Sequence, residues 1–514
     1  MRNAMRRLVA LTILSLVLAA APARAQEGSA SEAEARPARR LGLRETLALA
    51  VQQNPTLAAT TVDVAIADAQ IYQSLGLDDF VVDGGVSYFS QRKDAVAGQP
   101  FQQTALDQVS LSAGVGRGLS NGGRLGLAFD GGYTRSVNHV DFGMGAIDSV
   151  SEVYAPGIKL SYAQPFLRGF GYDVARAPRR RARAARDVAT LQREGAAAAL
   201  VRDVISAYWE LSYAVEDLEI RRASLALARE QLRIVQAGID AGRLARTASA
   251  EVEVAIAARE EEVLFAEQTL AERALDVRRL AGLEIGPGEI ELVATDKPAP
   301  VPAAVDLDAE LARALEQNPQ LKVIRAQGKQ VTIEIEVAEN GLLPQLDFQA
   351  AGGPAGNADN PGDALEQMAR FDSYNVQAGL VFQTPLGRRA ARGGLQVAEQ
   401  QLRKVKLGEA DVRAQISVAV ARGANAVRSA GKRIEVLAKS RDLALVNLDM
   451  EKARYEVGRT TNFEVLKRQD ELAQAQLRQA RARADYLKAV AVLEAITGAI
   501  LERYGIELSP ARGR

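Results

Sequence analysis

The residue types that most often perform catalysis are scarce in this chain of 514 residues. It contains no cysteine and one histidine, His139. His139 lies in a Gly- and Asp-rich stretch between predicted strands, where a solvent-exposed loop residue is expected rather than a metal ligand. Gly114 and Gly116 form a Gly-x-Gly pair without the helix start of a phosphate-binding loop, and they favour relief of crowding within strands. Glutamate pairs lie on helical faces without an apolar pocket, so we expect no catalysis, cofactor or bound metal.

The bulk composition narrows the class further. Without cysteine, disulfides, thiolate metal sites and a lipid-modified N-terminal cysteine are excluded. Lysine plus arginine and aspartate plus glutamate balance at 64 each, so the net charge does not suggest a nucleic-acid partner.

The N-terminus has the pattern of an export signal. Arg2, Arg6 and Arg7 precede an apolar run over residues 8–21, and Ala23-Arg24-Ala25 forms a small-x-small cleavage site. The run is shorter than the ~18–20 apolar residues that a membrane span needs. We therefore expect a signal peptide over residues 1–25, followed by a disordered leader over residues 26–40.

Most of the chain is a long sequence repeat. Residues 43–57 and 307–321 share Leu, Leu-Ala, Ala, Gln-Asn-Pro and Leu in the same order. Further pairs that recur in order are Val201-Arg202 with Val412-Arg413, Gly242-Arg243 with Gly458-Arg459, and Gly282 with Gly498. The period is too long for a solenoid and predicts two similar halves of one body.

Each half has the same predicted order of elements. A short helix over about 43–53 ends at Asn54-Pro55, which suits an N-cap and the first position of the next helix, to about residue 75. Alternating apolar and polar residues predict about four strand segments over 80–164 and two over 345–384. Residues 352–363 are expected to form a Gly/Asn/Asp/Pro-rich loop after the first of those two strands.

Very long helices follow the strands. Val204, Leu211, Leu218 and Leu225 fall at strict sevens, which is typical of a coiled-coil seam. The matching helix of the second half is expected over about 392–456, and each would be roughly 90–100 Å long. Both turn at Gly-Arg, near residues 242 and 458, and return over about 248–280 and 462–497. The first repeat thus covers 41–285, a linker 286–305, the second repeat 306–500 and a tail 501–514.

These elements require partners. A few strands with an apolar outer face cannot close a barrel alone, and open strand edges are not tolerated in lipid. An extended coiled-coil seam likewise needs neighbours along its length. A symmetric homo-oligomer meets both needs with a β-barrel in outer membrane lipid that continues as a helical tube in the periplasm. The alternative, a periplasmic coiled-coil scaffold or adaptor without a barrel, would not need strand pairs in both halves.

Several motifs resemble the TolC-type outer membrane efflux proteins. They are Tyr455-Glu-Val-Gly-Arg-Thr-Thr-Asn-Phe-Glu-Val-Leu466, the two Gln-Asn-Pro-x-Leu helix starts, Ala207-Tyr-Trp-Glu-Leu211 and Gln164-Pro-Phe-Leu-Arg-Gly169. The resemblance covers about residues 41–500. It implies a mostly α-helical chain with a membrane β-barrel part, assembled as a homotrimer with a 12-stranded barrel and a 12-helix tunnel. Six barrel strands per protomer would instead mean an 18-stranded trimer, although folded-over strands would preserve twelve.

The resemblance also implies a function. It is that of an exit duct for efflux or type I secretion, whose closed periplasmic tip opens when an adaptor and an inner-membrane pump dock. The motifs do not indicate a substrate. Gly242-Arg243 and Gly458-Arg459 match the helical-hairpin turns where the family meets its adaptor.

Three residues match the closed tip of the family. Tyr455 matches a tyrosine that helps to hold it closed, and Glu464 matches the first of two acidic positions that form rings across the entrance. Such rings favour cations. Lys467 stands where the second acid often lies, and one helical turn from Glu464 it would partly neutralise that carboxylate. An ordinary solvated helix charge is the alternative for Glu464.

Arginines are concentrated at the start of both long helices. They are Arg176, Arg179, Arg180, Arg181, Arg183 and Arg186 in the first half, and Arg388, Arg389 and Arg392 in the second. Cations are unfavourable at a helix N-terminus, so an anionic group is expected to compensate. Lipid phosphates on the periplasmic side of the outer membrane are one hypothesis. A solvated basic surface and an inward-facing cationic collar are equally consistent with the pattern.

Overall fold

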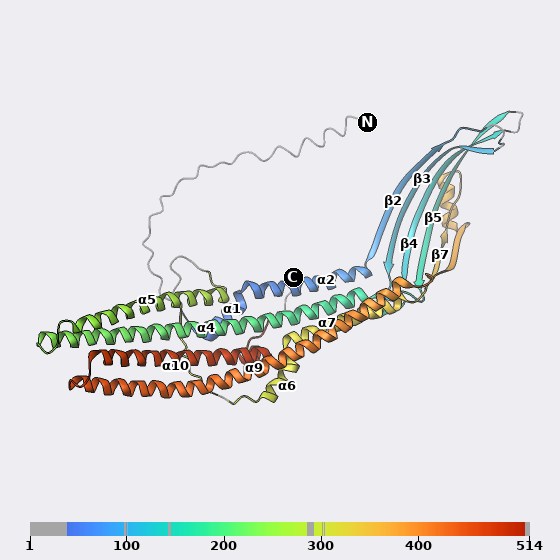
Figure 1. The fold of residues 1–514 in the computed structure, drawn as a ribbon. Coiled ribbons are helices and arrows are strands. Elements are labelled where there is room, and N and C mark those ends of the chain that lie inside the picture. The colour runs from blue at the N-terminus through green and yellow to red at the C-terminus, as the bar shows by residue number, and fades with distance from the viewer. Residues whose placement is uncertain are drawn as a thin grey trace, which may run out of the picture.

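The protein is a long body of helices that carries a curved β-sheet at one end (Figure 1). The computed structural model describes residues 39–96, 99, 101–141, 145–284, 292–300, 302 and 304–508. The expected signal peptide and most of the expected leader lie outside the described residues. Residues 39–40 were expected in that leader but belong to β1 (Arg39–Leu41), because this strand pairs in parallel with β6 (Leu292–Ala294).

The remaining elements follow the same order in both halves. Those of the first half are α1 (Leu43–Gln53), α2 (Pro55–Leu75), the 3-10 helix η1 (Gly76–Asp78), β2 (Phe80–Arg92), β3 (Phe101–Gly118), β4 (Arg124–Asp141), β5 (Ala146–Pro165), α3 (Tyr172–Ala175), α4 (Ala177–Asp240) and α5 (Ala248–Ala281). Those of the second half are α6 (Leu307–Gln317), α7 (Pro319–Gly341), β7 (Gln345–Pro354), α8 (Pro361–Arg370), β8 (Tyr374–Gln383), α9 (Arg389–Glu456), α10 (Asn462–Thr497) and α11 (Ile500–Arg503).

One short helix was not expected from the sequence. α8 begins inside the stretch that was predicted to be a loop, and it packs against β5. Asn360 caps it by accepting a hydrogen bond from the backbone N–H of Asp363, and Pro361 occupies its first position. The Asn-Pro pair is the same start signal as at α2 and α7, so the sequence contained the information.

The helices lie side by side as one wall (Figure 1). α4 has 64 residues and α9 has 68, so they extend about 96 and 102 Å. α5 and then α2 pack along α4, while α10 and then α7 pack along α9; α4 also contacts α10 and α7. Each long helix is therefore accompanied by two shorter helices that succeed one another along its length.

One short helix gives way to the next at a junction that is present in both halves of the chain. The Asn54 side chain accepts hydrogen bonds from the backbone N–H groups of Thr56 and Leu57 at the start of α2, and donates one of 2.9 Å to the Leu280 carbonyl near the end of α5. Asn318 repeats this at the start of α7, with a 2.8 Å bond to the Ile496 carbonyl of α10. The predicted N-caps are confirmed, and each also joins two helix ends.

Glycine completes each junction. Gly282 and Gly498 follow α5 and α10 with φ of 71° and 78°, in the left-handed region. A Cβ on Gly282 would lie 2.6 Å from the Gln53 carbonyl oxygen, and one on Gly498 would lie 2.7 Å from that of Gln317. Only glycine fits both the backbone conformation and the close approach.

The largest apolar core lies at the waist, where α1, α4, β6, α10 and α11 meet. Tyr208 of α4 is fully buried there, and its hydroxyl lies 2.9 Å from Asp296 Oδ2. Burial raises the pKa of Tyr208 to about 12. Two residues further on, Glu210 accepts a 2.8 Å hydrogen bond from Arg481 of α10. The Ala207–Leu211 motif thus joins the two halves of the chain.

We expect Gly282→Ala and Gly498→Ala to destabilise the fold strongly. The left-handed conformation costs about 1–2 kcal/mol for a residue with a side chain, and overpacking against the facing carbonyl adds about 1–3 kcal/mol. Calorimetric unfolding would measure the change. Gly505→Ala is the matched control, because Gly505 has φ of 63° but nothing within 4 Å of its Cβ position. Equal losses at all three sites would contradict the close-approach explanation.

Candidate functional site

The sheet is antiparallel throughout, in the order β2-β3-β4-β5-β7-β8. Its register forms one row across all six strands, with apolar side chains on five of them and a glycine on β7: Val82, Val115, Leu127, Leu160, Gly352 and Val376. A row of the opposite face holds Gly85, Ser112, Asp130 and Gly157. The sheet therefore has one apolar face and one face of small and polar residues, because side chains alternate between the faces.

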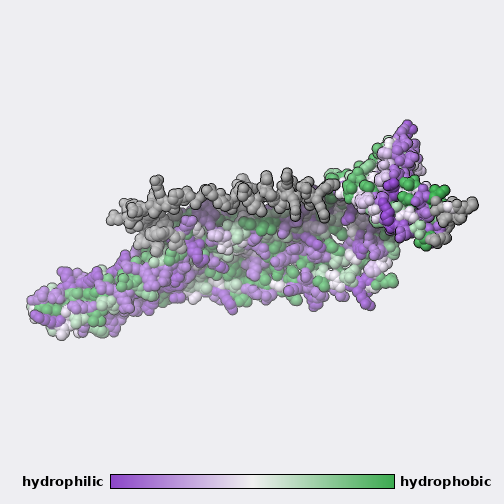
Figure 2. Space-filling model, turned by 90° about the horizontal axis from the view of Figure 1, so that it is seen from above, coloured by the Kyte–Doolittle hydropathy of each residue, from purple (hydrophilic) through white to green (hydrophobic). Residues whose placement is uncertain are grey.

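The apolar face has defined limits along the strands. Tyr88, Tyr133 and Tyr154 lie in one register row on the side away from the helices, and the rings of Tyr133 and Tyr154 are 4.9 Å apart. From Phe80 to Tyr88 the band is about 9 residues long, close to the ~9–11 that a membrane strand needs. Figure 2 shows hydrophobic and hydrophilic side chains in separate patches over the sheet.

Beyond the tyrosine row, the same face becomes charged. Arg92 and Asp107 form an ion pair of 2.7 Å, and Arg135 lies 3.5 Å from Glu152. His139 lies in this extension, in strand β4 rather than in the loop that was expected, with Nδ1 2.7 Å from Asp148 of β5. β4 runs further than the glycine and aspartate content suggested because β5 pairs with it along its whole length.

The tip at the other end of the body consists of two short connections, one between α4 and α5 and one between α9 and α10. Gly242 ends the turn after α4 and Gly458 the turn after α9, with φ of 68° and 70°. The following N–H groups, of Arg243 and Arg459, donate 2.9 Å hydrogen bonds to carbonyls of the preceding helix. All four residues are exposed, so the surfaces predicted to contact an adaptor are accessible in the single chain.

The three predicted gate residues lie on one hairpin, and among the described residues no hydrogen bond or ion pair joins one of them to another. Tyr455 packs against Leu448, Val465 and Leu472, and this burial raises its pKa. Glu464 lies in the first turn of α10, 3.8 Å from Arg468. Lys467 is exposed. Glu464 is thus paired with Arg468 at i+4 rather than with Lys467 at i+3, although both positions lie beside it on the helix surface.

Buried polar contacts join the α4–α5 hairpin to the α9–α10 hairpin, and the sequence patterns did not predict them. Gln231 of α4 donates a 2.7 Å hydrogen bond to Asn462 of α10. Arg259 of α5 is 6% exposed, and its Nη1 donates 3.1 Å hydrogen bonds to the Ser224 carbonyl and to Gln469. Desolvation lowers the pKa of Arg259. A signal was present, since Arg259 occupies a heptad position between the buried Val252 and Ala266.

The basic cluster at the start of α4 is compensated by carboxylates of the protein. Arg176 and Arg179 both pair with Asp78 of η1, while Arg180 and Arg181 pair with Glu336 and Glu334 of α7. The last two distances are 2.5 and 2.6 Å. The expectation of an anionic partner was right, and each of these four arginines has a carboxylate partner within the protein, without lipid phosphate. The cluster instead fixes α4 against the elements that lead into the sheet.

The equivalent arginines of the second half are arranged differently. Arg388 has φ of 49° and donates a 3.1 Å hydrogen bond to the Leu342 carbonyl, while Arg389 is exposed at the start of α9. Arg389 remains available to a lipid surface or to solvent.

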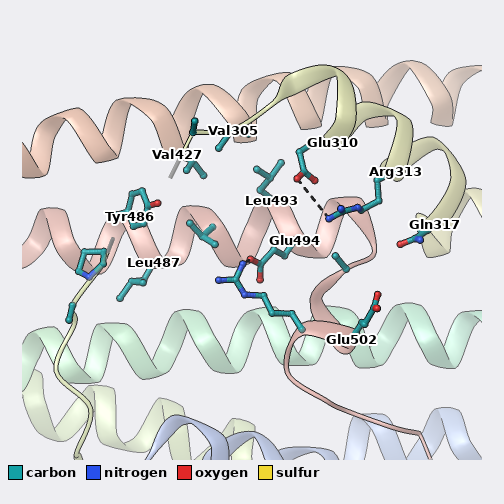
Figure 3. Close-up of a pocket in the computed structure, with 16 residues that line it drawn as sticks. Val305, Glu310, Arg313, Gln317, Val427, Tyr486, Leu487, Leu493, Glu494 and Glu502 are labelled. Carbon is teal, nitrogen blue, oxygen red and sulfur yellow. Dashed lines mark hydrogen bonds and ion pairs between the residues drawn. The ribbon is translucent and has the colours of Figure 1, made fainter. Parts of the chain in front are cut away.

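A cavity of about 810 Å³ lies at the waist, between α6, α9, α10 and α11 (Figure 3). Tyr486, Val427 and Leu493 form its apolar wall. Glu494 pairs with Arg503, and its Oε2 atom has no hydrogen-bond partner among the described residues. Burial raises the pKa of Glu494 to about 6, and the nearby Glu310 carboxylate adds to that rise.

Within the described residues, no three or more histidine, aspartate or glutamate side chains are grouped so that they could hold a metal ion. In the same part of the chain, no helix has both the length and the apolar character required to cross a membrane.

The chain is similar to known proteins in part of its sequence and in most of its fold. Residues 311–499 match the family model of the outer membrane efflux proteins. Solved structures with a similar fold include the outer-membrane channel OprN, the CmeC outer membrane channel of Campylobacter jejuni and the outer membrane protein VceC of Vibrio cholerae, each with a TM-score of 0.62. No curated protein sequence matches the chain significantly.

The structural likeness extends over most of each chain. It covers 89% of this chain in all three cases, and 90% of OprN, 86% of CmeC and 96% of VceC, at 15%, 14% and 14% sequence identity. Residues 311–499 thus match the outer membrane efflux protein family model, and nearly the whole chain has the fold of these channels. The predicted TolC-type resemblance and the mostly α-helical fold class with an antiparallel sheet are confirmed.

We expect the stability of the protein to fall as the pH rises from about 4.5 to about 6, in the part that Glu494 contributes. The folded state raises the pKa of Glu494 from 4.5 to about 6. In this window the folded chain keeps a proton that the unfolded chain has lost, so raising the pH disfavours folding. Glu494→Gln should remove this component. Unfolding midpoints of both proteins across the window measure it, and parallel profiles would contradict the assignment.

Proposed function

We propose that three copies of this chain form an outer membrane exit duct for a tripartite efflux or type I secretion system. The sheets would form a barrel in the outer membrane, and the helices a tube in the periplasm. The observation that carries this proposal is the apolar band of about 9 residues on one face of a sheet joined to a helical body about 100 Å long. The family match supports a duct rather than an enzyme.

The helical body supports assembly by its exposed apolar residues. Val436, Leu443 and Met450 recur at sevens on α9 and are 65%, 65% and 52% exposed. Val254 and Phe265 of α5 are 71% and 66% exposed. α9 and α5 lie at opposite edges of the helical wall (Figure 1). In a closed ring, α9 of one copy would meet α5 of the next, which buries both sets.

The tip would control passage. Three copies of Glu464 around the axis would form an acidic ring that favours cations, weakened by the Arg468 beside each carboxylate. Arg259 and Gln231 would hold the two hairpins of each protomer together in the closed state. The exposed turns at Gly242 and Gly458 would receive a periplasmic adaptor that connects the duct to an inner-membrane pump.

Fractionation and size measurement test the proposal. We expect the mature protein to be recovered from the outer membrane in detergent, as a trimer by light scattering. Recovery in the soluble periplasmic fraction without detergent would contradict the duct and favour the alternative, a periplasmic coiled-coil scaffold or adaptor.

Selectivity in planar bilayers tests the tip. Glu464→Gln should lower the preference for cations over anions, because it removes the acidic ring. Arg468→Gln should raise that preference, because it removes the charge that partly neutralises each carboxylate. Unchanged reversal potentials for both test variants would rule out Glu464 as a pore-lining residue.

A further inference from the structure

We infer that the barrel of this duct has 18 strands, six from each copy, with β8 of one copy paired antiparallel to β2 of the next. This inference rests on the proposed trimeric duct. It differs from the 12 strands that the family resemblance implies, and it makes the pore wall incomplete without the neighbouring copy.

The first argument is that the hairpin β3–β4 is part of the sheet. β3 pairs with β2 from Phe80↔Arg117 to Arg92↔Ala105, and β4 pairs with β5 from Arg124↔Ala163 to Asp141↔Ala146. β3 and β4 also pair with each other. β2 and β5 are therefore separated by two strands, or about 14 Å over three strand spacings. They cannot pair directly while the hairpin occupies this place.

The second argument is that the hairpin has the same apolar face as the other strands. Val109, Ala113 and Val115 of β3 align with Tyr133, Phe129 and Leu127 of β4. Leu111 of β3 and Leu125 of β4 lie on the same face, the one that holds Val82 and Leu160. Leu111, Leu125 and Leu127 are 46%, 45% and 48% exposed in the single chain. A hairpin folded over the barrel mouth in water would not need an apolar face, whereas a wall strand in lipid does.

The third argument concerns the two edges. Among the described residues, β2 and β8 have a strand neighbour on one side only. Their free backbone groups must be satisfied in lipid, which a closed barrel achieves. β2 leads away from the helices and β8 leads back to them, so neighbouring copies would meet antiparallel without any rearrangement.

The residues at the edges fit a second copy. The apolar face of β2 runs from Phe80 to Tyr88, and that of β8 runs from Tyr374 to Phe382, so both have an aromatic residue at each end. All these apolar positions have even numbers on both strands. Pairing even with even positions continues the apolar face across the junction, whereas a one-residue slip would turn it into the pore.

The pore would be correspondingly wide. Barrel diameter grows roughly linearly with strand number, so 18 strands give a bore about 1.5 times that of 12. The face that would line it carries small residues on the inserted hairpin, including Ser110, Ser112, Gly114, Gly126 and Gly132. The barrel would then offer little resistance, and the narrow point would be the tip.

Cysteine crosslinking tests the junction, since the chain has no cysteine of its own. Gln377→Cys on β8 is combined in turn with Asp83→Cys, Gly85→Cys and Ser87→Cys on β2, all on the polar face. We expect at least one pair to yield covalent dimers and trimers on non-reducing gels. Gln377→Cys with Val86→Cys is the control, because these side chains lie on opposite faces and should not crosslink. An intact trimer without crosslinks in all three test pairs would overturn the inference.

A second pair distinguishes 18 strands from 12. Asp83 and Lys159 lie on the same face in one register row, separated by Gly114 and Ala128. A disulfide needs Cβ atoms about 4 Å apart, so Asp83→Cys with Lys159→Cys should stay uncrosslinked in an 18-stranded barrel. Crosslinking within one copy would show β2 beside β5, with the hairpin excluded, and would overturn the inference.

Electron cryo-microscopy of the trimer gives the direct count, with 18 strands expected in cross-section. Twelve strands would refute this inference alone. A protein that is not trimeric or not in the outer membrane would instead refute the proposed function.

Discussion

The architecture depends on two junctions, at Asn54 and Asn318. At each of them, one short helix packed along a long helix ends and the next one begins. A helix of about 100 Å cannot bury its apolar face unless it is accompanied along its whole length. Each asparagine caps one companion helix and holds the end of the other, and Gly282 or Gly498 allows the two ends to approach closely. Because the two halves use the same junction, the change of partner occurs at corresponding places along α4 and α9. The apolar core around Tyr208 lies beside the Asn54 junction.

Ion pairs extend this rigidity toward the sheet. Asp78 stands directly before β2, and it pairs with Arg176 and Arg179 at the start of the helix that follows β5. Glu334 and Glu336 stand near the end of α7, which leads to β7. The arginines of α4 therefore join three of the chain segments that enter or leave the sheet. At the tip, by contrast, Arg259 is held by carbonyl and amide oxygens, which bind a cation less strongly than carboxylates do.

Local patterns predicted most of the helices and strands. Periodicity and the Asn-Pro starts placed α1, α2 and α10 at the observed residues, because these signals act over one or two turns. The pairing of Glu464 with Arg468 was open to prediction, because positions i+3 and i+4 both lie beside a helical residue. The carboxylates that pair with Arg176 to Arg181 could not be predicted. They depend on which helical faces meet, over separations of more than about 100 residues for the arginine cluster. The Gln231–Asn462 contact is non-local for the same reason.

The inserted hairpin has a consequence for how such ducts can vary between relatives. In the proposed barrel β2 and β8 meet antiparallel, so a protomer would gain strands only two at a time, and a threefold ring only six at a time. The barrel diameter can therefore increase only in steps. The number of helices in the wall does not increase with it. A wider barrel on an unchanged tube must flare where the two join. The arginine cluster between η1, α4 and α7 lies at that place, and there a change in strand number would have to be accommodated.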